Sequence, residues 1–423
     1  MPRITLTLAI FLLTLALILI RPRGLHEAWA TVLGGGLMLL CGLETGAQAW
    51  RTVAQGADVL LFLLALLLLS DLLRASGFFE WAAILAARAA GGDGRALFRN
   101  VFLLGALITA FLSLDTTAVI LTPIVLSFVG RLRLTPRPFL LACAFVANTG
   151  SLLLPVSNLT NLLFVSAFRI RFETFALHMA LPLVVAVAVN YALFRRLFGR
   201  DLPDCFDEDA LPPPGSVLPD APYFRGAVAV LLCVLIGYFV GSLTGVPPYV
   251  IALAGCAALL AWGLWRRQVD WGILREITWP LFPFVIGLFV VVRGVENLGL
   301  AGAAARGLAD AGRAPLAQIL ATAFGAGVGS NVVNNIPMAL LAISVLKHVP
   351  ASVPAQYGAL LGCDLGPNLT VAGSLATMLV ISSARRQGED IGARQFFAVG
   401  VWTTPPLLLV SGLALWLTLR LFP

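Results

Sequence analysis

Residues 148–161 read NTGSLLLPVSNLTN, and residues 364–374 read DLGPNLTVAGS. Each polar stretch interrupts a long apolar segment, 138–168 in the first half of the chain and 354–384 in the second. Asn148 and Asp364 are separated by the same number of residues as Asn158 and Ser374. Gly, Pro and Asn clusters end helices. The sequence therefore predicts two related halves, each with one broken helix.

The composition places the chain among membrane proteins. Of its 423 residues, 59% are hydrophobic and 12% are charged, against roughly 25% charged in soluble domains. Apolar runs of about 20 residues, the length of a transmembrane helix, follow one another along the chain. These runs are continuous rather than alternating, which excludes a β-barrel. We predict an all-α membrane protein.

A polar linker rich in Pro and Asp, residues 199–222, separates the predicted halves. Apolar runs in residues 1–198 recur in the same order in residues 223–423. We predict two repeats, each with about five transmembrane helices, one of them broken, plus a re-entrant hairpin. Short amphipathic segments at 78–90 and 299–311 precede the two hairpins, and we expect them to lie in the membrane interface.

Residues 97–130 form the first predicted hairpin. The run is too long for one simple helix, and polar residues around Asp115 interrupt its centre. Arg95 precedes it, Arg99 lies at its beginning and Arg131 follows it, so both ends are expected on the cytoplasmic side. We predict that the chain enters to about the midplane, turns at Asp115 and returns.

The second hairpin is predicted at residues 315–347, with its tip at 329–335. After an odd number of crossings, here five, the chain is on the side of the membrane opposite to where it began. The second half therefore starts from the opposite side, and the repeats are inverted. Most of the 28 Lys and Arg residues then lie on the linker side. The positive-inside bias thus predicts a cytoplasmic linker, a periplasmic N-terminus and a periplasmic second hairpin. It also accounts for the net charge of +7 without a nucleic-acid partner.

Polar residues at midplane depth are the candidate site, because bare backbone and charged groups are costly there unless they line a cavity. Corresponding breaks in two halves are typical of transporter binding sites. Asp115 and Asp364 are the candidate carboxylates for proton coupling. Helix capping is the alternative role for the Asn residues and for Asp364. The predicted substrate or ion site comprises Asp115, Thr116, Thr117, Asn148, Ser157, Asn158, Asn161, Asn334, Asn335, Asp364, Asn368 and Ser374.

Other chemistries find little support in the sequence. The six Cys residues show neither CxxC nor metal-ligand spacing, so we expect no disulfide framework and no metal site. Cys363 is the one thiol beside the candidate site, and we expect it to pack. HExxH and GxSxG motifs are absent, so we do not expect an enzyme.

Four strings make the chain similar to a known family. They are DTTAVILTP (115–123), VSNLTN (156–161), NNIP (334–337) and GCDLGPNLTVAGSLAT (362–377). The whole chain resembles the arsenical pump membrane proteins, the ArsB-type arsenite antiporters. These share a superfamily with sodium/proton antiporters and dicarboxylate carriers. The Ser-Asn-Thr marks of the dicarboxylate branch are missing here.

This resemblance implies export of arsenite and antimonite, as trihydroxides, across the bacterial inner membrane in exchange for protons. It implies no cofactor beyond the proton-motive force, and a soluble arsenite-stimulated ATPase as an optional partner. The chain departs from the family at Leu114-Asp115-Thr116, where Asn-Asp-Gly is common, and at Ala147-Asn148-Thr149, where Ala-Asp-Thr is common. Because the second departure removes a carboxylate, coupling is expected at Asp115, with Asp364 as the second candidate. The alternative function is sodium/proton antiport.

Overall fold

The computed structural model describes residues 2–298, 314–347 and 352–422. Within these ranges the chain is helical, and its only β-pairing is an isolated bridge between Asp93 and Cys205. Eight described helices are long and apolar enough to cross a membrane, or nine if α3 (Gly46–Gln55) and α4 (Ala57–Ala75), bent by 51°, form one span. The prediction of an all-α membrane protein is confirmed.

The helices follow the predicted order of apolar runs. Besides α3 and α4, the helices of the first half are α1 (Pro2–Ile20), α2 (Glu27–Leu40), α5 (Phe78–Arg88), α6 (Gly94–Phe111), α7 (Leu114–Thr116), α8 (Thr122–Arg131), α9 (Pro136–Thr149), α10 (Leu159–Phe168) and α11 (Phe172–Phe198). Those of the second half are α12 (Ala221–Thr244), α13 (Pro248–Trp265), α14 (Ile273–Glu276), α15 (Leu281–Glu296), α17 (Pro315–Val333), α18 (Asn335–Lys347), α19 (Val353–Leu365), α20 (Leu375–Arg386) and α21 (Ala393–Leu421).

Both predicted helix breaks are present. The chain between α9 and α10 forms two short 3₁₀ turns, Gly150–Leu152 and Pro155–Ser157. The chain between α19 and α20 forms two more, Gly366–Leu369 and Val371–Gly373. Proline has no N–H to donate and clashes with the preceding turn, so Pro155 and Pro367 prevent a continuous helix.

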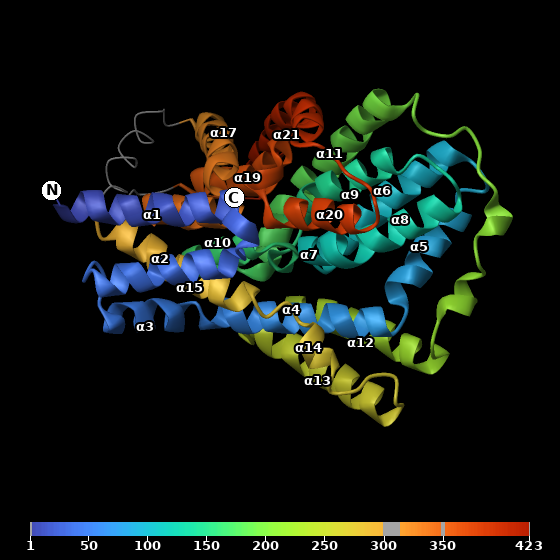
Figure 1. Ribbon diagram of the computed structural model, residues 1–423, viewed down its shortest axis with the longest axis horizontal. Helices are drawn as coiled ribbons and strands as arrows, with labels where there is room; N and C mark the ends of the chain where they lie inside the picture. The colour runs from blue at the N-terminus through green and yellow to red at the C-terminus, as the bar shows by residue number, and fades with distance from the viewer. Residues whose placement is uncertain (1, 299–313, 348–351, 423) are drawn as a thin grey trace.

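The helices form two groups (Figure 1). The first, called the scaffold below, contains α1 to α4 with α12, α13 and α15, and the second, called the core, contains α6 to α11 with α17 to α21. In the scaffold α2 packs along α15 and α4 packs along α13, so each half supplies one helix to each pair. The core meets the scaffold where α10 packs on α4 and α18 packs on α15.

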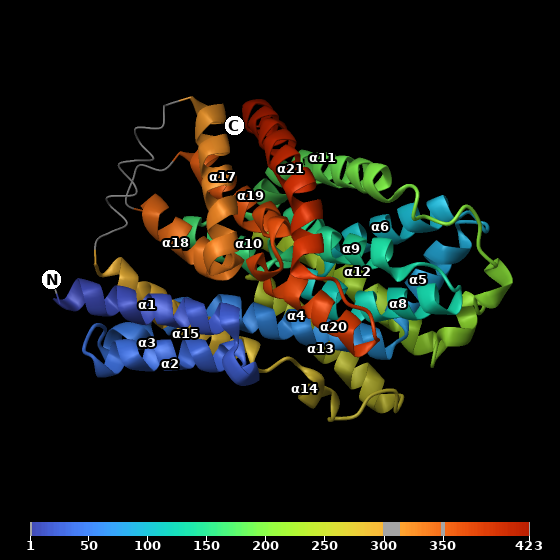
Figure 2. The same ribbon diagram turned by 45° about the horizontal axis from the view of Figure 1, so that its top comes forward.

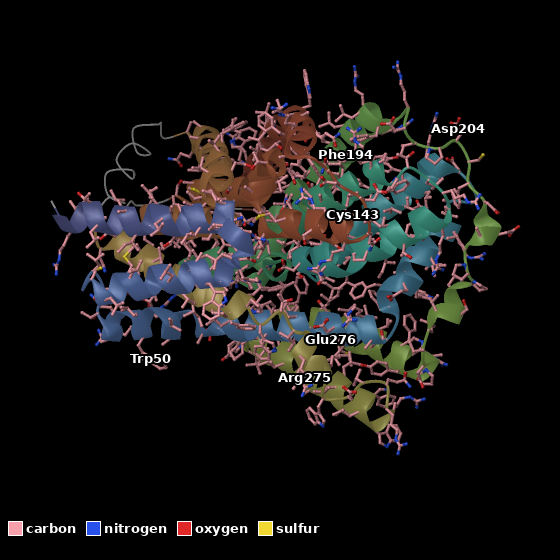
Figure 3. The ribbon with its side chains drawn as sticks, viewed as in Figure 1. Trp50, Cys143, Phe194, Asp204, Arg275 and Glu276 are labelled. Atoms are coloured by element: carbon pink, nitrogen blue, oxygen red, sulfur yellow. The ribbon has the colours of Figure 1, made fainter. Side chains whose placement is uncertain are left out.

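The linker and the N-terminus lie at opposite ends of the molecule (Figure 1). Figure 3 places Trp50 of α3 near the N-terminal end, Asp204 of the linker at the other end and Cys143 between them. The linker is tied to α5 and α6, because Arg88 Nη2 donates to the Leu211 carbonyl at 2.7 Å and Arg95 Nη2 to Asp204 Oδ1 at 3.2 Å.

The predicted hairpins correspond to α6 to α8 and to α17 with α18. Figure 1 shows α6 and α8 on the linker side of α7, and Figure 2 shows α17 and α18 toward the opposite end. The re-entrant paths and the inverted relation of the halves stay predictions. The predicted amphipathic segment at 78–90 is the helix α5, whereas that at 299–311 lies outside the described residues.

Candidate functional site

The first hairpin tip turns earlier than predicted. The break falls at Leu112 and Ser113, and Asp115 lies in the first turn of the returning arm rather than at the turn itself. Ser113 adopts an extended conformation and its Oγ accepts from the Thr116 backbone N–H at 3.1 Å, which caps the new helix. Asp115 is partly exposed and has no hydrogen-bond or ion-pair partner among the described residues.

The two threonines after Asp115 contact protein groups. Thr116 Oγ1 lies 2.7 Å from Ser70 Oγ of α4 and 2.9 Å from Ser113 Oγ. Thr117 Oγ1 lies 2.7 Å from Thr109 Oγ1. Both hydroxyls hold the tip against its neighbours.

The second tip turns at a single residue. Helix α17 is continuous to Val333, so of the predicted turn at 329–335 only Asn334 is non-helical, with φ 75°. Its ψ of 156° lies outside the left-handed helical region that asparagine tolerates, so Asn334 holds a strained backbone conformation that non-glycine residues rarely adopt. Asn334 Nδ2 donates to the Ala372 carbonyl at 3.0 Å, so the tip is anchored to the second break. Asn335, which begins α18, is 3% exposed, and its Oδ1 has no hydrogen-bond partner.

Asp364 joins the two helix breaks. Its Oδ1 accepts from Asn158 Nδ2 at 2.9 Å and from Thr160 Oγ1 at 2.5 Å, and its Oδ2 has no partner. The Asp364 side chain is fully buried. Asn158 also caps α10, because its Oδ1 accepts from the Thr160 backbone N–H at 3.2 Å.

A second bridge between the halves is formed by Asn148 and Asn368. Asn148 Nδ2 donates to Asn368 Oδ1 at 3.0 Å and to Thr377 Oγ1 at 3.1 Å. Asn368 Nδ2 in turn donates to Thr149 Oγ1 at 3.1 Å. Both Asn side chains are fully buried. Their amides therefore connect the repeats.

A cavity of about 20 Å³ lies where the tips and breaks meet. Of the predicted residues it is lined by Asp115, Asn158, Asn335 and Ser374. Five helices begin there, because α7, α10, α15, α18 and α20 start at residues 114, 159, 281, 335 and 375, all of which line the cavity. Helix N-termini carry partial positive charge and free N–H groups. The cavity thus combines one carboxylate with five convergent helix starts.

The other predicted residues do not line this cavity. Ser157 Oγ donates to the Ala110 carbonyl at 2.7 Å, and Asn161 Nδ2 donates to the carbonyls of Ser151 and Leu154 at 2.7 and 3.0 Å. The Asn161 bonds satisfy backbone groups freed by the first break, and the Ser157 bond satisfies a carbonyl at the end of α6. The remaining residues are Thr116, Thr117, Asn148, Asn334, Asp364 and Asn368.

Several residues that hydrogen-bond to the predicted site residues were not themselves predicted. Thr160 and Ser151 belong to the first break, so their place in that polar stretch was a usable signal. Thr377 follows the second break and is buried. Ser70 lies in a leucine-rich helix, and nothing in its local sequence distinguishes it from a packing residue.

A larger cavity of about 480 Å³, called the vestibule below, lies beside the small one between scaffold and core. Val59, Leu163 and Leu340 line the vestibule, and the residues four positions away on the same helices line the small cavity. The two cavities are therefore about one helical turn apart. Arg169, Arg293, Glu296 and Lys347 also line the vestibule.

Comparison with known sequences decides the family. The family model described as "Arsenical pump membrane protein" matches residues 6–419. The chain belongs to the arsenical pump membrane protein family. It is therefore a multi-pass membrane transporter of arsenicals, as its resemblance implies.

Arsenical pump relatives match over nearly the full length. An arsenical pump membrane protein of Yersinia enterocolitica is 35% identical, with 97% of this chain and 98% of that protein covered. One from Escherichia coli K12 is 33% identical with the same coverage. An uncharacterized transporter of Mycobacterium tuberculosis is 28% identical, with 97% of each chain covered.

A solved transporter shares the fold of this arsenical pump family member. The YdaH transporter of Alcanivorax borkumensis, whose crystal structure is described as having an unusual topology, matches with a TM-score of 0.58. The match covers 88% of this chain and 87% of that one at 17% sequence identity. At this identity the likeness concerns the fold alone.

Proposed function

We propose that this protein exports arsenite, and antimonite, from the cytoplasm across the bacterial inner membrane in exchange for protons. The observation that carries the proposal is the cavity where the unpartnered Asp115 carboxylate meets five helix N-termini. No Arg or Lys lines this cavity, so it suits a neutral solute better than an anion. Arsenite is an uncharged trihydroxide at neutral pH.

The lining groups match the hydrogen bonds that a trihydroxide can make. Its O–H groups can donate to the Asp115 carboxylate and to Asn335 Oδ1, which has no protein partner. Its oxygens can accept from Ser374 Oγ, which already accepts from the Thr377 backbone N–H at 3.4 Å. The leucines and Ile336 supply the apolar remainder of the wall.

Asp115 is the group that we assign to proton exchange. A deprotonated carboxylate binds the substrate hydroxyls through charge-assisted hydrogen bonds, and protonation removes the charge and turns one acceptor oxygen into a donor, so proton and substrate compete for one site. A neutral solute gains nothing from the membrane potential, which acts on charge. Competition at Asp115 therefore couples uphill export to proton entry.

Asp364 has a different assignment, although the sequence names both carboxylates for coupling. It lies outside the cavity lining, and one of its oxygens is held by Asn158 and Thr160. We propose that Asp364 orders the two broken helices around the site.

The vestibule is the proposed release route to the periplasm. It lies between scaffold and core, one helical turn from the site, on the side away from the linker. A relative movement of core and scaffold, as inverted repeats permit, would connect the cavities. The N-terminus is then periplasmic and the linker cytoplasmic.

The test is proton-gradient-driven arsenite uptake into inverted membrane vesicles, with wild type beside Asp115→Asn. We expect wild-type uptake to stop when the gradient is dissipated, and the variant to lose gradient-driven uptake while its melting temperature is preserved. Asp115→Glu, which keeps a carboxylate, should retain part of the activity. The proposal is wrong if wild-type uptake does not depend on the proton gradient, or if Asp115→Asn retains gradient-driven uptake. Sodium/proton exchange without arsenite uptake would establish the alternative function.

A further inference from the structure

A third cavity, of about 520 Å³, lies in the core apart from the small cavity, and it shares Arg169 with the lining of the vestibule. It is enclosed by the loop between α10 and α11, the first turns of α11, the starts of α17 and α19 and the end of α21. Helix α11 has 27 residues and leads into the linker, so it is about 40 Å long and its start lies at the end opposite the linker. The cavity therefore opens near one membrane surface.

Cationic side chains gather around this apolar cavity. Its lining includes Arg169, Arg171 and Arg420 beside the apolar side chains of Ile319, Val353 and Leu419. Arg171 Nε is 3.1 Å from Glu173 Oε1. Arg169 and Arg420 form no ion pair with any described residue.

Arg420 is held in place without being neutralised. Its guanidinium lies 4.1 Å from the centroid of the Trp416 ring, a cation–π contact that leaves its N–H groups available to an anion. The predicted orientation puts these arginines on the side that the positive-inside bias depletes of cations. The membrane orientation therefore does not explain why these arginines are present, whereas binding of an anionic ligand does.

Two buried polar side chains in the same lining each have one atom without a hydrogen-bond partner. Tyr357 is 2% exposed, and its Oη has no hydrogen-bond partner. His178 Nε2 lies 2.9 Å from the Phe422 carbonyl, so Nε2 carries the proton and Nδ1 is an acceptor without a donor. Buried polar atoms normally have partners. One donor and one acceptor are therefore left beside the apolar wall.

We propose that this cavity binds an anionic phospholipid of the leaflet opposite the linker. The phosphate would lie between the guanidiniums of Arg169 and Arg420, and an acyl chain would cover the apolar wall. The polar glycerol region would lie nearest Tyr357 and His178. Free phosphate would satisfy the arginines alone, so a lipid matches both the charge and the apolar lining. The bound lipid would join the base of the second predicted hairpin to α11 and α21.

The experiment compares melting temperatures of the purified full chain in detergent with added phosphatidylglycerol, phosphatidylcholine or inorganic phosphate. We expect phosphatidylglycerol alone to raise the melting temperature, by about 3 °C or more. The double variant Arg169→Gln/Arg420→Gln should lose this shift. The charge-matched control Arg51→Gln/Arg394→Gln, at exposed positions outside the cavity, should keep it.

Native mass spectrometry of the same proteins gives a second measurement that does not depend on the variants' stability. Wild type should retain phosphatidylglycerol against an excess of phosphatidylcholine, and Tyr357→Phe, which keeps the wall but removes the hydroxyl, should retain less. An equal shift with phosphatidylcholine or with inorganic phosphate would overturn the proposal. An undiminished shift in the Arg169→Gln/Arg420→Gln variant would do the same. Arsenite transport is not the readout, so this result is independent of the proposed function.

Discussion

The two oxygens of Asp364 have different surroundings. Oδ1 accepts two hydrogen bonds from the first helix break, and Oδ2 has no partner. An amide at this position can keep its carbonyl oxygen where Oδ1 lies, whereas an apolar side chain cannot accept a hydrogen bond. Substitutions of similar size at residue 364 therefore separate the role of the acceptor from the role of the charge.

We expect Asp364→Asn to fold and to retain arsenite uptake within about threefold of wild type, a change of well under 1 kcal/mol in transition-state free energy. Asp364→Leu should unfold at lower temperature, because it removes the acceptor of Thr160 Oγ1, and an unsatisfied buried group costs about 1–3 kcal/mol. Melting curves and vesicle uptake measure both effects. Loss of gradient-driven uptake in Asp364→Asn at unchanged stability would make Asp364 a coupling group.

Glu44 provides a pH-dependent contribution to stability. It lies in the turn between α2 and α3, is 2% exposed, and neither of its carboxyl oxygens has a hydrogen-bond partner. Burial raises the pKa of Glu44 from 4.5 to about 7, although Arg293 nearby acts to lower it. The folded protein therefore binds a proton that the unfolded chain releases between these two pH values.

The sign of the effect follows from this raised pKa. Stability from protonated Glu44 is fully present below pH 4.5 and is lost as the pH rises through about 7. We expect the melting temperature to fall over this interval, and to fall less in Glu44→Gln. The isosteric control Asp209→Asn, at an exposed linker position, should keep the wild-type slope. Equal slopes in wild type and Glu44→Gln would contradict this assignment.

At the scale of elements, α17 and α19 approach each other through glycines. A Cβ at Gly362 would lie 2.2 Å from the Ala323 carbonyl oxygen, and a Cβ at Gly366 would lie 2.3 Å from Gly327 Cα. These contacts are with backbone atoms, so a side chain cannot be accommodated by a rotamer change. Small residues at four-residue spacing let membrane helices pack closely. Asp364 lies in sequence between these two glycines, of which Gly362 belongs to α19 and Gly366 begins the turn that follows it.

Gly362→Ala and Gly366→Ala should therefore separate α17 from α19 and lower the melting temperature by several degrees. A methyl group forced into a packed interface costs about 1–3 kcal/mol. Gly325→Ala is the matched control on α17, since a Cβ there would meet nothing within 4 Å. Uptake should fall in the first two variants and persist in the control. Stable, active Gly362→Ala protein would show that this interface has more room than the structure indicates.

At the scale of the whole molecule, the orientation in the membrane can be read from two native cysteines. Cys41 follows α2 near the N-terminal end, Cys205 lies in the linker, and both are exposed. Cys143, Cys256 and Cys363 are buried. The proposed orientation places Cys41 in the periplasm and Cys205 in the cytoplasm.

A membrane-impermeant maleimide should therefore label Cys41 but not Cys205 in spheroplasts, and the pattern should reverse in inverted vesicles. The variants Cys41→Ser/Cys233→Ser and Cys205→Ser/Cys233→Ser each leave one exposed reporter. Detergent-permeabilised membranes serve as the control, because both cysteines should react there. Labelling of Cys205 from outside intact spheroplasts would invert the proposed topology and the direction of transport.

Local sequence was sufficient to predict the helices and their breaks. Apolar runs long enough to span a bilayer form helices, because every backbone group must be paired inside the hydrocarbon. Pro155 and Pro367 favour interruption of such runs because proline cannot donate the backbone hydrogen bond, and the Gly, Ser and Asn residues around them complete the breaks, whereas α11 and α21 continue through Pro182 and Pro405. The breaks, and the polar residues they bring to midplane depth, followed from these two rules.

The roles of the individual polar residues depended on tertiary packing. Asn148 and Asn158 belong to the same polar stretch, yet Asn148 donates to Asn368 whereas Asn158 lines the small cavity and bonds Asp364. Nothing in the local sequence distinguishes an amide that joins two helices from one that lines a cavity. Their partners lie in the other half of the chain, so the direction of each side chain is decided only when the two halves pack together.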